Sequence, residues 1–295
     1  MRRSLFIWIL ILFISACGGS PASTAGTTAP VILTSTSFLA DITRNIAGDR
    51  ATVDSLLPVG TDPHSYQPTP QDITRIEHSK LLIVNGADYE HFLEPLLKNA
   101  GGKREVIEAS TGVNLRRDAQ NLDPHVWLDP NNIIACVENI REALTHFDPE
   151  GAAVYKSNAE AYVVQLKNLD TWIKEQVNQI APDRRLLITN HEALGYFAER
   201  YGFTISGTVI ESFSTDASPS AKQIAALIDQ IRSSGAPAIF LDASDNSALA
   251  DQIAAETGVR VITDLHLESL TDGAPAATYL DMMKYNVSQI VNALK

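Results

Sequence analysis

The chain has 295 residues, of which 45% are hydrophobic and 20% are charged, and its formal net charge is −12. This composition is typical of a globular protein with one large or two ordinary domains, and it excludes collagen-like and broadly disordered chains. The 35 acidic and 23 basic residues exclude a general nucleic-acid binder, and two cysteines exclude a disulfide scaffold.

The first 16 residues predict a secretory signal peptide. A positive start, Met1–Arg3, precedes the uncharged apolar run Leu5–Ile14, which is too short for a typical membrane-spanning helix. The small residues Ser15 and Ala16 and then Cys17 follow, an ending that resembles a bacterial lipobox. This resemblance implies that Cys17 becomes the mature N-terminus and carries lipid. The alternative is an ordinary signal peptide with a chance cysteine.

Residues 17–30 predict a lipid-anchored flexible tether, because Gly18–Pro30 contains no charged and no large apolar residue. Removal of residues 1–16 leaves 21 basic and 35 acidic residues, a net charge of −14, which suits a protein that attracts cations. Cys136 then has no internal partner. It lies in an apolar helical pattern, so we expect a buried, unreactive thiol.

Residues 31–148 predict an N-terminal α/β lobe. Its expected strands are 31–35, 53–57, 81–86 and 105–109. The third is a short, nearly all-apolar run, which is typical of a buried parallel strand. Helical stretches separate the strands, and this alternation favours parallel βα units.

Residues 149–181 predict one long helix that connects two lobes. Apolar residues recur there in steps of three and four, at Tyr162, Leu166, Leu169, Ile173, Val177 and Ile180. These positions form one helical stripe, and about 30 residues would span roughly 45 Å. A core helix of one large domain is the alternative, but the position between two βα sets favours a connecting helix.

Residues 182–295 predict a C-terminal α/β lobe of the same kind. Its expected strands are 185–189, 204–210, 238–242 and 259–263, and a helix over 279–294 closes the chain. The predicted fold class is therefore α/β. Two lobes, each with a mostly parallel sheet flanked by helices, are joined by one long helix.

Three of the seven histidines lie in similar settings, in loops of the predicted α/β lobes. His64 and His125 each lie in the sequence Asp-Pro-His, and His191 follows the strand 185–189 and opens a helix. Open α/β sheets place ligands in such loops, and proline restricts the loop that presents the imidazole. Each histidine alone fits a surface or capping role, but the three together indicate a metal site. Weaker candidates, in polar or helix-end settings, are His78, His91 and His146.

Four motifs of the chain resemble one known family. They are DPHSYQPTP, DPHVWLDPNN, NHEALGYFAERYG and YLDMMKYN, and they are similar to motifs of the zinc- and manganese-binding lipoproteins of bacterial ABC importers, the cluster A-I (cluster 9) solute-binding proteins. The resemblance runs from about residue 31 to the C-terminus. It implies two lobes joined by a rigid helix, with one metal ion buried between them.

The same resemblance implies the protein's partners and location. We expect an extracytoplasmic protein, at the cell surface or in the periplasm, that is anchored to the membrane by its N-terminal lipid. It would deliver its metal to an ABC permease with a cytoplasmic ATPase. We also expect a monomer that does not bind nucleic acid.

The first three metal ligands that the resemblance assigns are His64, His125 and His191. The family's fourth ligand is normally an Asp in the pattern Thr-Asp-Ser-Leu. Here Glu268–Leu270 lines up with that pattern, so Glu268 is expected to take the place of the Asp. Asp264 and His266 lie near enough to compete, and Glu192 is a further carboxylate beside the third histidine.

In this family the third ligand tends to be His in zinc-type and Glu in manganese-type members, so His191 points to Zn²⁺ as the transported ligand. Three imidazoles and one carboxylate also suit tetrahedral zinc. Many zinc-type relatives carry a histidine-rich loop that residues 112–124 lack, which keeps Mn²⁺ or Fe²⁺ as an alternative.

Two other classes of function share these residues. A zinc-dependent hydrolase could use the same three histidines and an open water position, and an adhesin could bind a metal incidentally. The sequence has no His-Glu-x-x-His helix and no obvious nucleophile motif. We therefore expect a binding protein and not an enzyme.

Overall fold

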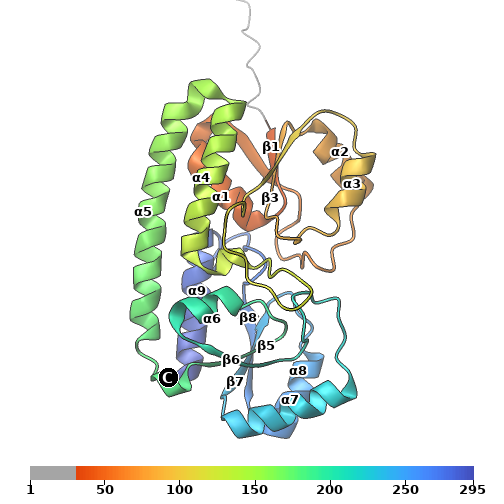
Figure 1. Cartoon of the computed structure of the whole chain (residues 1–295), viewed down its shortest axis with the longest axis vertical. Helices are drawn as coiled ribbons and strands as arrows, with labels where there is room; N and C mark the ends of the chain where they lie inside the picture. The colour runs from red at the N-terminus through yellow and green to blue at the C-terminus, as the bar shows by residue number, and fades with distance from the viewer. Residues whose placement is uncertain (1–30) are drawn as a thin grey trace, which may run out of the picture.

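The structure, a computed structural model, describes residues 31–295 as two α/β lobes beside one long helix (Figure 1). The predicted signal peptide, the tether and Cys17 lie outside the described residues. Within residues 31–295, every helix is too short or too polar to span a bilayer.

The N-terminal lobe contains a sheet of four parallel strands in the order β2-β1-β3-β4. The strands are β1 (Val31–Thr34), β2 (Thr52–Ser55), β3 (Leu81–Val84) and β4 (Glu105–Glu108), and the helices are α1 (Ser37–Ala47), α2 (Pro70–His78), α3 (Leu93–Asn99) and α4 (Pro130–Phe147). β3 is buried along its whole length, as its apolar sequence requires. α4 begins with Pro130, and the Asp129 side chain accepts the Asn131 N–H there.

The C-terminal lobe repeats this topology with four parallel strands in the order β6-β5-β7-β8. The strands are β5 (Leu186–Thr189), β6 (Thr204–Thr208), β7 (Ala238–Asp242) and β8 (Arg260–Leu265), and the helices are α6 (Gly195–Tyr201), α7 (Ala221–Ser234), α8 (Ala248–Thr257) and α9 (Tyr279–Leu294). The predicted fold class is confirmed. In each lobe the strand order reverses beside the first strand, where parallel sheets leave a crevice for ligands.

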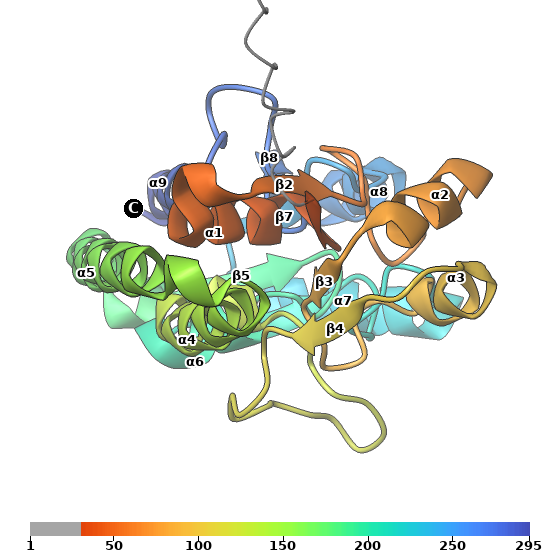
Figure 2. The same ribbon diagram turned by 90° about the horizontal axis from the view of Figure 1, so that it is seen from above.

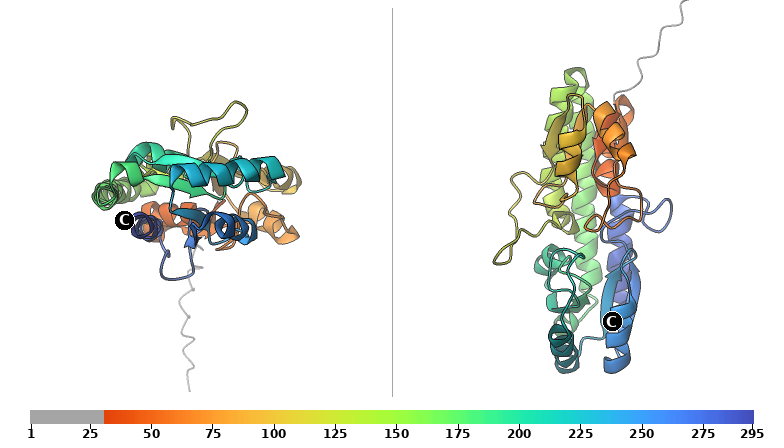
Figure 3. Two further views of the ribbon diagram at one scale, coloured as in Figure 1. Left: turned by 90° about the horizontal axis from the view of Figure 1, so that it is seen from below. Right: turned by 90° about the vertical axis from the view of Figure 1, so that its right-hand side faces the viewer.

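Helix α5 (Ala152–Val177) has 26 residues and runs alongside both lobes (Figures 1 and 3). It packs against α1 and α4 of the N-terminal lobe and against α9 of the C-terminal lobe, and Figure 2 shows α5 and α9 at the same side of the molecule. At 1.5 Å per residue it spans about 39 Å. The helix is shorter than expected at both ends, because Pro149–Gly151 forms a separate 3₁₀ turn and the helix ends at Val177. The predicted stripe is buried: Tyr162, Leu166, Leu169, Ile173, Val177 and Ile180.

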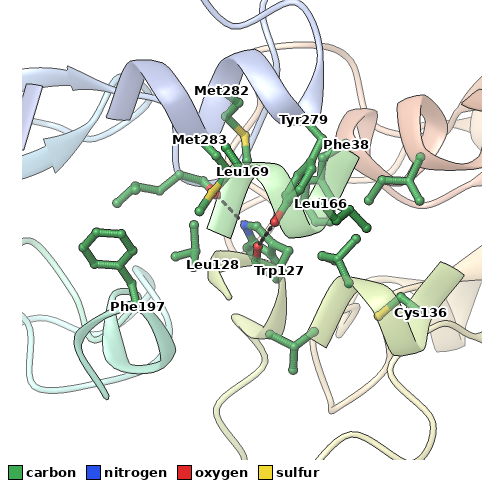
Figure 4. Packing of buried hydrophobic residues seen from close by; sticks show 14 of the residues in the cluster. Phe38, Trp127, Leu128, Cys136, Leu166, Leu169, Phe197, Tyr279, Met282 and Met283 are labelled. Atoms are coloured by element: carbon green, nitrogen blue, oxygen red, sulfur yellow. Dashed lines mark hydrogen bonds between the residues drawn. The ribbon is translucent and has the colours of Figure 1, made fainter. Parts of the chain in front are cut away.

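A continuous hydrophobic core joins the two lobes around Trp127 (Figure 4). The indole ring stacks on Phe38 with 4.6 Å between ring centroids. Its N–H donates to the Leu267 carbonyl at 2.7 Å, and the Trp127 carbonyl accepts the Tyr279 hydroxyl at 2.7 Å. These bonds join the loop before α4 to the segment that follows β8 and to the first residue of α9. They therefore hold the two lobes in a defined register.

Cys136 lies in the same core on α4 (Figure 4). Its thiol is free and buried, and burial raises the pKa of that thiol to about 12. The predicted buried thiol is confirmed, and its protonated state makes it a poor nucleophile at neutral pH.

We predict that Trp127→Phe lowers the free energy of unfolding by about 1–3 kcal/mol, because it leaves the buried Leu267 carbonyl without its donor. Urea unfolding followed by circular dichroism measures the change. Trp172→Phe is the matched control, since Trp172 is only partly buried at the edge of the core and should lose less. Equal losses in the two variants would contradict the assigned role of the bond.

Candidate metal centre

Four side chains from four loops meet where the two lobes face each other. His64 lies between β2 and α2, His125 between β4 and α4, His191 between β5 and α6, and Glu268 between β8 and α9. All four are buried, and the exposed fraction is 9% for His64 and 2% or less for the others. Each lobe therefore contributes two side chains to one buried cluster.

The donor atoms of this cluster converge. Each of the four residues offers one nitrogen or oxygen, and these atoms all lie within 4.8 Å of one another. His125 Nε2 and His191 Nε2 are 3.3 Å apart, and Glu268 Oε1 lies 3.3 and 3.2 Å from them. His64 Nε2 and Glu268 Oε1 are buried without a hydrogen-bond partner. Such unpartnered atoms are costly unless something else satisfies them.

The ring of His125 is oriented from behind by Asp123. One Asp123 carboxylate oxygen accepts the His125 backbone N–H at 3.1 Å and lies 2.9 Å from Nδ1. Arg116 Nε donates to the other oxygen at 3.3 Å, and the Tyr196 hydroxyl donates to the Asp123 carbonyl at 2.9 Å. Nε2 is thereby left to face the cluster, as is usual for a histidine that binds metal.

The second Asp-Pro-His motif uses its aspartate differently. Asp62 accepts the backbone N–H of His64 at 2.9 Å and the hydroxyls of Ser65 at 2.9 Å and Thr215 at 2.6 Å. It shapes the loop and ties it to the C-terminal lobe, but it makes no hydrogen bond to the His64 ring. His64 is thus held by its backbone and its surroundings.

Glu268 is held on both its backbone and its side chain. Asp242 accepts the backbone N–H groups of Leu267 and Glu268. The Tyr89 hydroxyl donates to Glu268 Oε2 at 2.6 Å. Sequence reasoning missed both Asp242 and Tyr89. Asp242 is the last residue of the apolar strand β7, and Tyr89 follows the apolar strand β3. The available signal was their position at the end of the sheet where ligands are expected.

The charges of the cluster are strongly coupled. Burial lowers the pKa of His64 to about 4. Burial also lowers the pKa of His125, but the carboxylates of Glu268 and Asp123 outweigh it and raise that pKa to about 9. Burial raises the pKa of Glu268, yet the neighbouring histidines hold it well below its usual range. At neutral pH the cluster therefore contains an ionised carboxylate and a protonated His125.

The competing residues lie outside the cluster. Asp264 is exposed on β8 and accepts the Tyr285 hydroxyl at 2.6 Å, and the His266 ring packs on Tyr285 with 5.5 Å between centroids. Glu192 is half-buried, and burial and nearby carboxylates raise its pKa. The remaining candidates are exposed and also outside: His78, His91 and His146.

A cavity of about 330 Å³ borders the cluster on the His64 side. It is lined by Asp88, His91 and Asp118 of the N-terminal lobe and by Phe213 of the C-terminal lobe. The other three members of the cluster do not line this cavity. His64 is thus the side chain through which the cluster meets the solvent-accessible space.

The chain is similar to known proteins over most of its length. The family model described as zinc-uptake complex component A, periplasmic, matches residues 32–293. The chain is 33% identical to the manganese-binding lipoprotein MntA of Halalkalibacterium halodurans in an alignment 295 residues long, which covers 99% of this chain and 97% of the relative.

Two solved structures are also similar. The Mn-bound periplasmic metal binding protein of Candidatus Liberibacter asiaticus has a TM-score of 0.80 and 32% identity, covering 90% of this chain and 100% of that one. The periplasmic zinc binding protein TroA of Treponema pallidum has a TM-score of 0.84 and 27% identity, covering 90% of this chain and 99% of that one.

We predict that the binding of a divalent metal at pH 7 releases the proton of His125, because that ring must become neutral to bind, whereas His64 is already neutral. Affinity should rise about tenfold per pH unit from 7 to 9 and then level off. Calorimetry in buffers of different ionisation enthalpy measures the release. Asp123→Asn should reduce it, and a release near zero from the unaltered chain would contradict the assignment.

Proposed function

The chain belongs to the zinc-uptake component A family of metal solute-binding proteins of ABC importers, and we propose that its own cargo is Zn²⁺ held by His64, His125, His191 and Glu268. Membership of this family also distinguishes between a binding protein and a zinc-dependent hydrolase. Its members are solute-binding proteins, so the hydrolase considered from the three histidines is wrong.

One observation supports the ligand assignment above all others. His64 Nε2 and Glu268 Oε1 are buried, have no hydrogen-bond partner and belong to a set of four donors within 4.8 Å. A metal ion satisfies both atoms at once, whereas no other group of the described residues does. Three imidazole nitrogens and one carboxylate oxygen match the donor set and coordination number that zinc prefers.

Manganese is the second candidate cargo. The relative MntA is named manganese-binding, and the similar structure from Candidatus Liberibacter asiaticus is Mn-bound. Manganese favours more oxygen ligands than zinc does. In this cluster only Glu268 could supply a second oxygen, by binding through both carboxylate atoms.

Capture and release follow from the arrangement of the lobes. The ion enters from the cavity beside His64, displaces the proton of His125 and becomes enclosed between the lobes. Because α5 packs against both lobes along its length, it opposes a wide hinge motion. Release therefore uses local movement of the His64 loop, which borders the cavity, when the protein docks on its permease.

The location of the protein follows from its N-terminus. Lipid on Cys17 anchors a monomer to the outer face of the membrane, and the uncharged segment 18–30 separates the folded lobes from it. Cys17→Ser should move the mature protein from the membrane fraction to the soluble fraction. Retention of that variant in the membrane fraction would contradict the lipid anchor.

We predict that Glu268→Ala and His191→Ala each weaken zinc binding by about a hundredfold or more, because each removes one of four ligands. Competition calorimetry on the mature chain carrying Cys17→Ser measures the affinities. Asp264→Ala is the matched control, since Asp264 is a nearby carboxylate that is exposed and outside the cluster, and it should leave the affinity unchanged. Unchanged affinity in Glu268→Ala would contradict its role as the fourth ligand.

A further inference from the structure

The two carboxylate oxygens of Glu268 have different surroundings. Oε2 accepts the hydroxyl of Tyr89 at 2.6 Å. Oε1 faces the three histidines and has no hydrogen-bond partner. The neutral hydroxyl of a tyrosine donates to a carboxylate in a short, strong hydrogen bond. One lone pair of Oε2 is therefore already used and that oxygen is held toward Tyr89, whereas both lone pairs of Oε1 are free for an ion.

Tyr89 belongs to the opposite lobe from Glu268 and is firmly placed there. Its side chain is 1% exposed. Its ring lies edge-on to His64, with 5.3 Å between centroids, and contacts the Trp127 ring at 4.9 Å. The hydroxyl therefore cannot swing away from Glu268 without disturbing a ligand on one side and the inter-lobe core on the other.

The loop that presents Tyr89 is unusually constrained. Ala87 and Asp88 adopt left-handed backbone angles, with φ of 54° and 59°, a conformation that persists only where the surroundings enforce it. The partly buried Glu90 carboxylate does so by accepting the N–H groups of Asn85 at 2.6 Å and Gly86 at 3.1 Å and the Ser35 hydroxyl at 2.7 Å.

The same loop is tied to the loop that carries His125. The Asn85 side-chain amide donates to the Pro124 carbonyl at 3.0 Å. The position of Tyr89 is thus set by the same framework that positions one of the histidines. This rigidity makes the Tyr89 hydroxyl a fixed reference point for the carboxylate that arrives from the C-terminal lobe.

We infer that Tyr89 is a specificity-determining positioning residue that restricts Glu268 to one metal-binding oxygen and so favours a four-coordinate ion, zinc, over manganese. This inference rests on the proposed function, because it takes the four-residue cluster as the metal site. With Oε2 engaged, the cluster offers three nitrogens and one oxygen. Without the hydroxyl, Glu268 can rotate and bind through both oxygens, which adds the oxygen ligand that manganese prefers.

Tyr89→Phe tests the inference, because it keeps the ring and its packing and removes only the hydroxyl. Zinc affinity should fall about 10- to 100-fold, as when other partners of metal ligands are lost. Manganese affinity should stay the same or increase, so the zinc-to-manganese affinity ratio should fall at least about tenfold. Competition calorimetry with Zn²⁺ and Mn²⁺ measures both. The visible absorption of bound Co²⁺, strong in four-coordinate sites, should weaken in the variant.

Tyr155→Phe is the matched control. Tyr155 is also buried and donates to a carboxylate, that of Asp148, at 2.6 Å, but it contacts none of the four cluster residues. It should leave the affinity ratio and the Co²⁺ spectrum unchanged. In Tyr89→Phe, an unchanged ratio or an equal loss for both metals would overturn the inference, since an equal loss indicates a purely structural role.

A measurement on the unaltered chain keeps the test independent of how the variant folds. Zinc-edge X-ray absorption should give four ligands, three of nitrogen and one of oxygen, and five or more ligands would overturn the inference. If the unaltered chain bound neither zinc nor manganese, the proposed function would fail and the inference with it. If the chain binds zinc but Tyr89→Phe keeps the ratio, only the inference fails.

Discussion

The hydrogen bond from the Trp127 indole to the Leu267 carbonyl, 2.7 Å long, is the contact on which the metal centre depends. Trp127 lies two residues after His125, in the loop between β4 and α4. Leu267 lies one residue before Glu268, in the loop between β8 and α9, so the bond joins the two loops next to a ligand in each. A cluster built from two lobes has a defined geometry only if the lobes have a defined register. Trp127 supplies that register where the ligands are, and α5 supports it along the side of the molecule.

The second constraint is electrostatic. Three imidazoles and an ionised carboxylate are buried together, and Asp123 adds another buried charge behind His125. Burying such groups is costly unless they are paired. Without metal, a proton on His125 provides part of the pairing. A divalent cation pairs more strongly with the carboxylate and also satisfies the atoms that have no partner. Relief of this unfavourable burial contributes to the affinity for the ion.

Sequence patterns predicted most of the fold, because each signal was local. The apolar run of β3 and the three-to-four spacing along α5 needed no information from distant residues. The three histidines were predicted for a similar reason, since His64 and His125 lie in Asp-Pro-His motifs and His191 follows a strand. Glu268 could be preferred over Asp264 only through the resemblance to the family's motif. The two residues are separated in space because β8 ends at Leu265, which leaves Asp264 on the strand and Glu268 in the loop after it. The role of Tyr89 could not be predicted, because its partner lies 179 residues away on the other lobe. The shared Asp-Pro-His sequence also did not predict that Asp123 contacts its histidine ring and Asp62 does not.

A diffraction measurement at the absorption edge of the bound metal tests the central claim most directly, because it identifies the element and locates it among its ligands. On crystals of the protein loaded with an equimolar mixture of Zn²⁺ and Mn²⁺, we expect a single anomalous peak at the zinc edge. That peak should lie within bonding distance of Nε2 of His125 and His191, of a ring nitrogen of His64 and of one oxygen of Glu268. A peak elsewhere, a ligand set without Glu268, or a manganese signal in place of zinc would contradict the account.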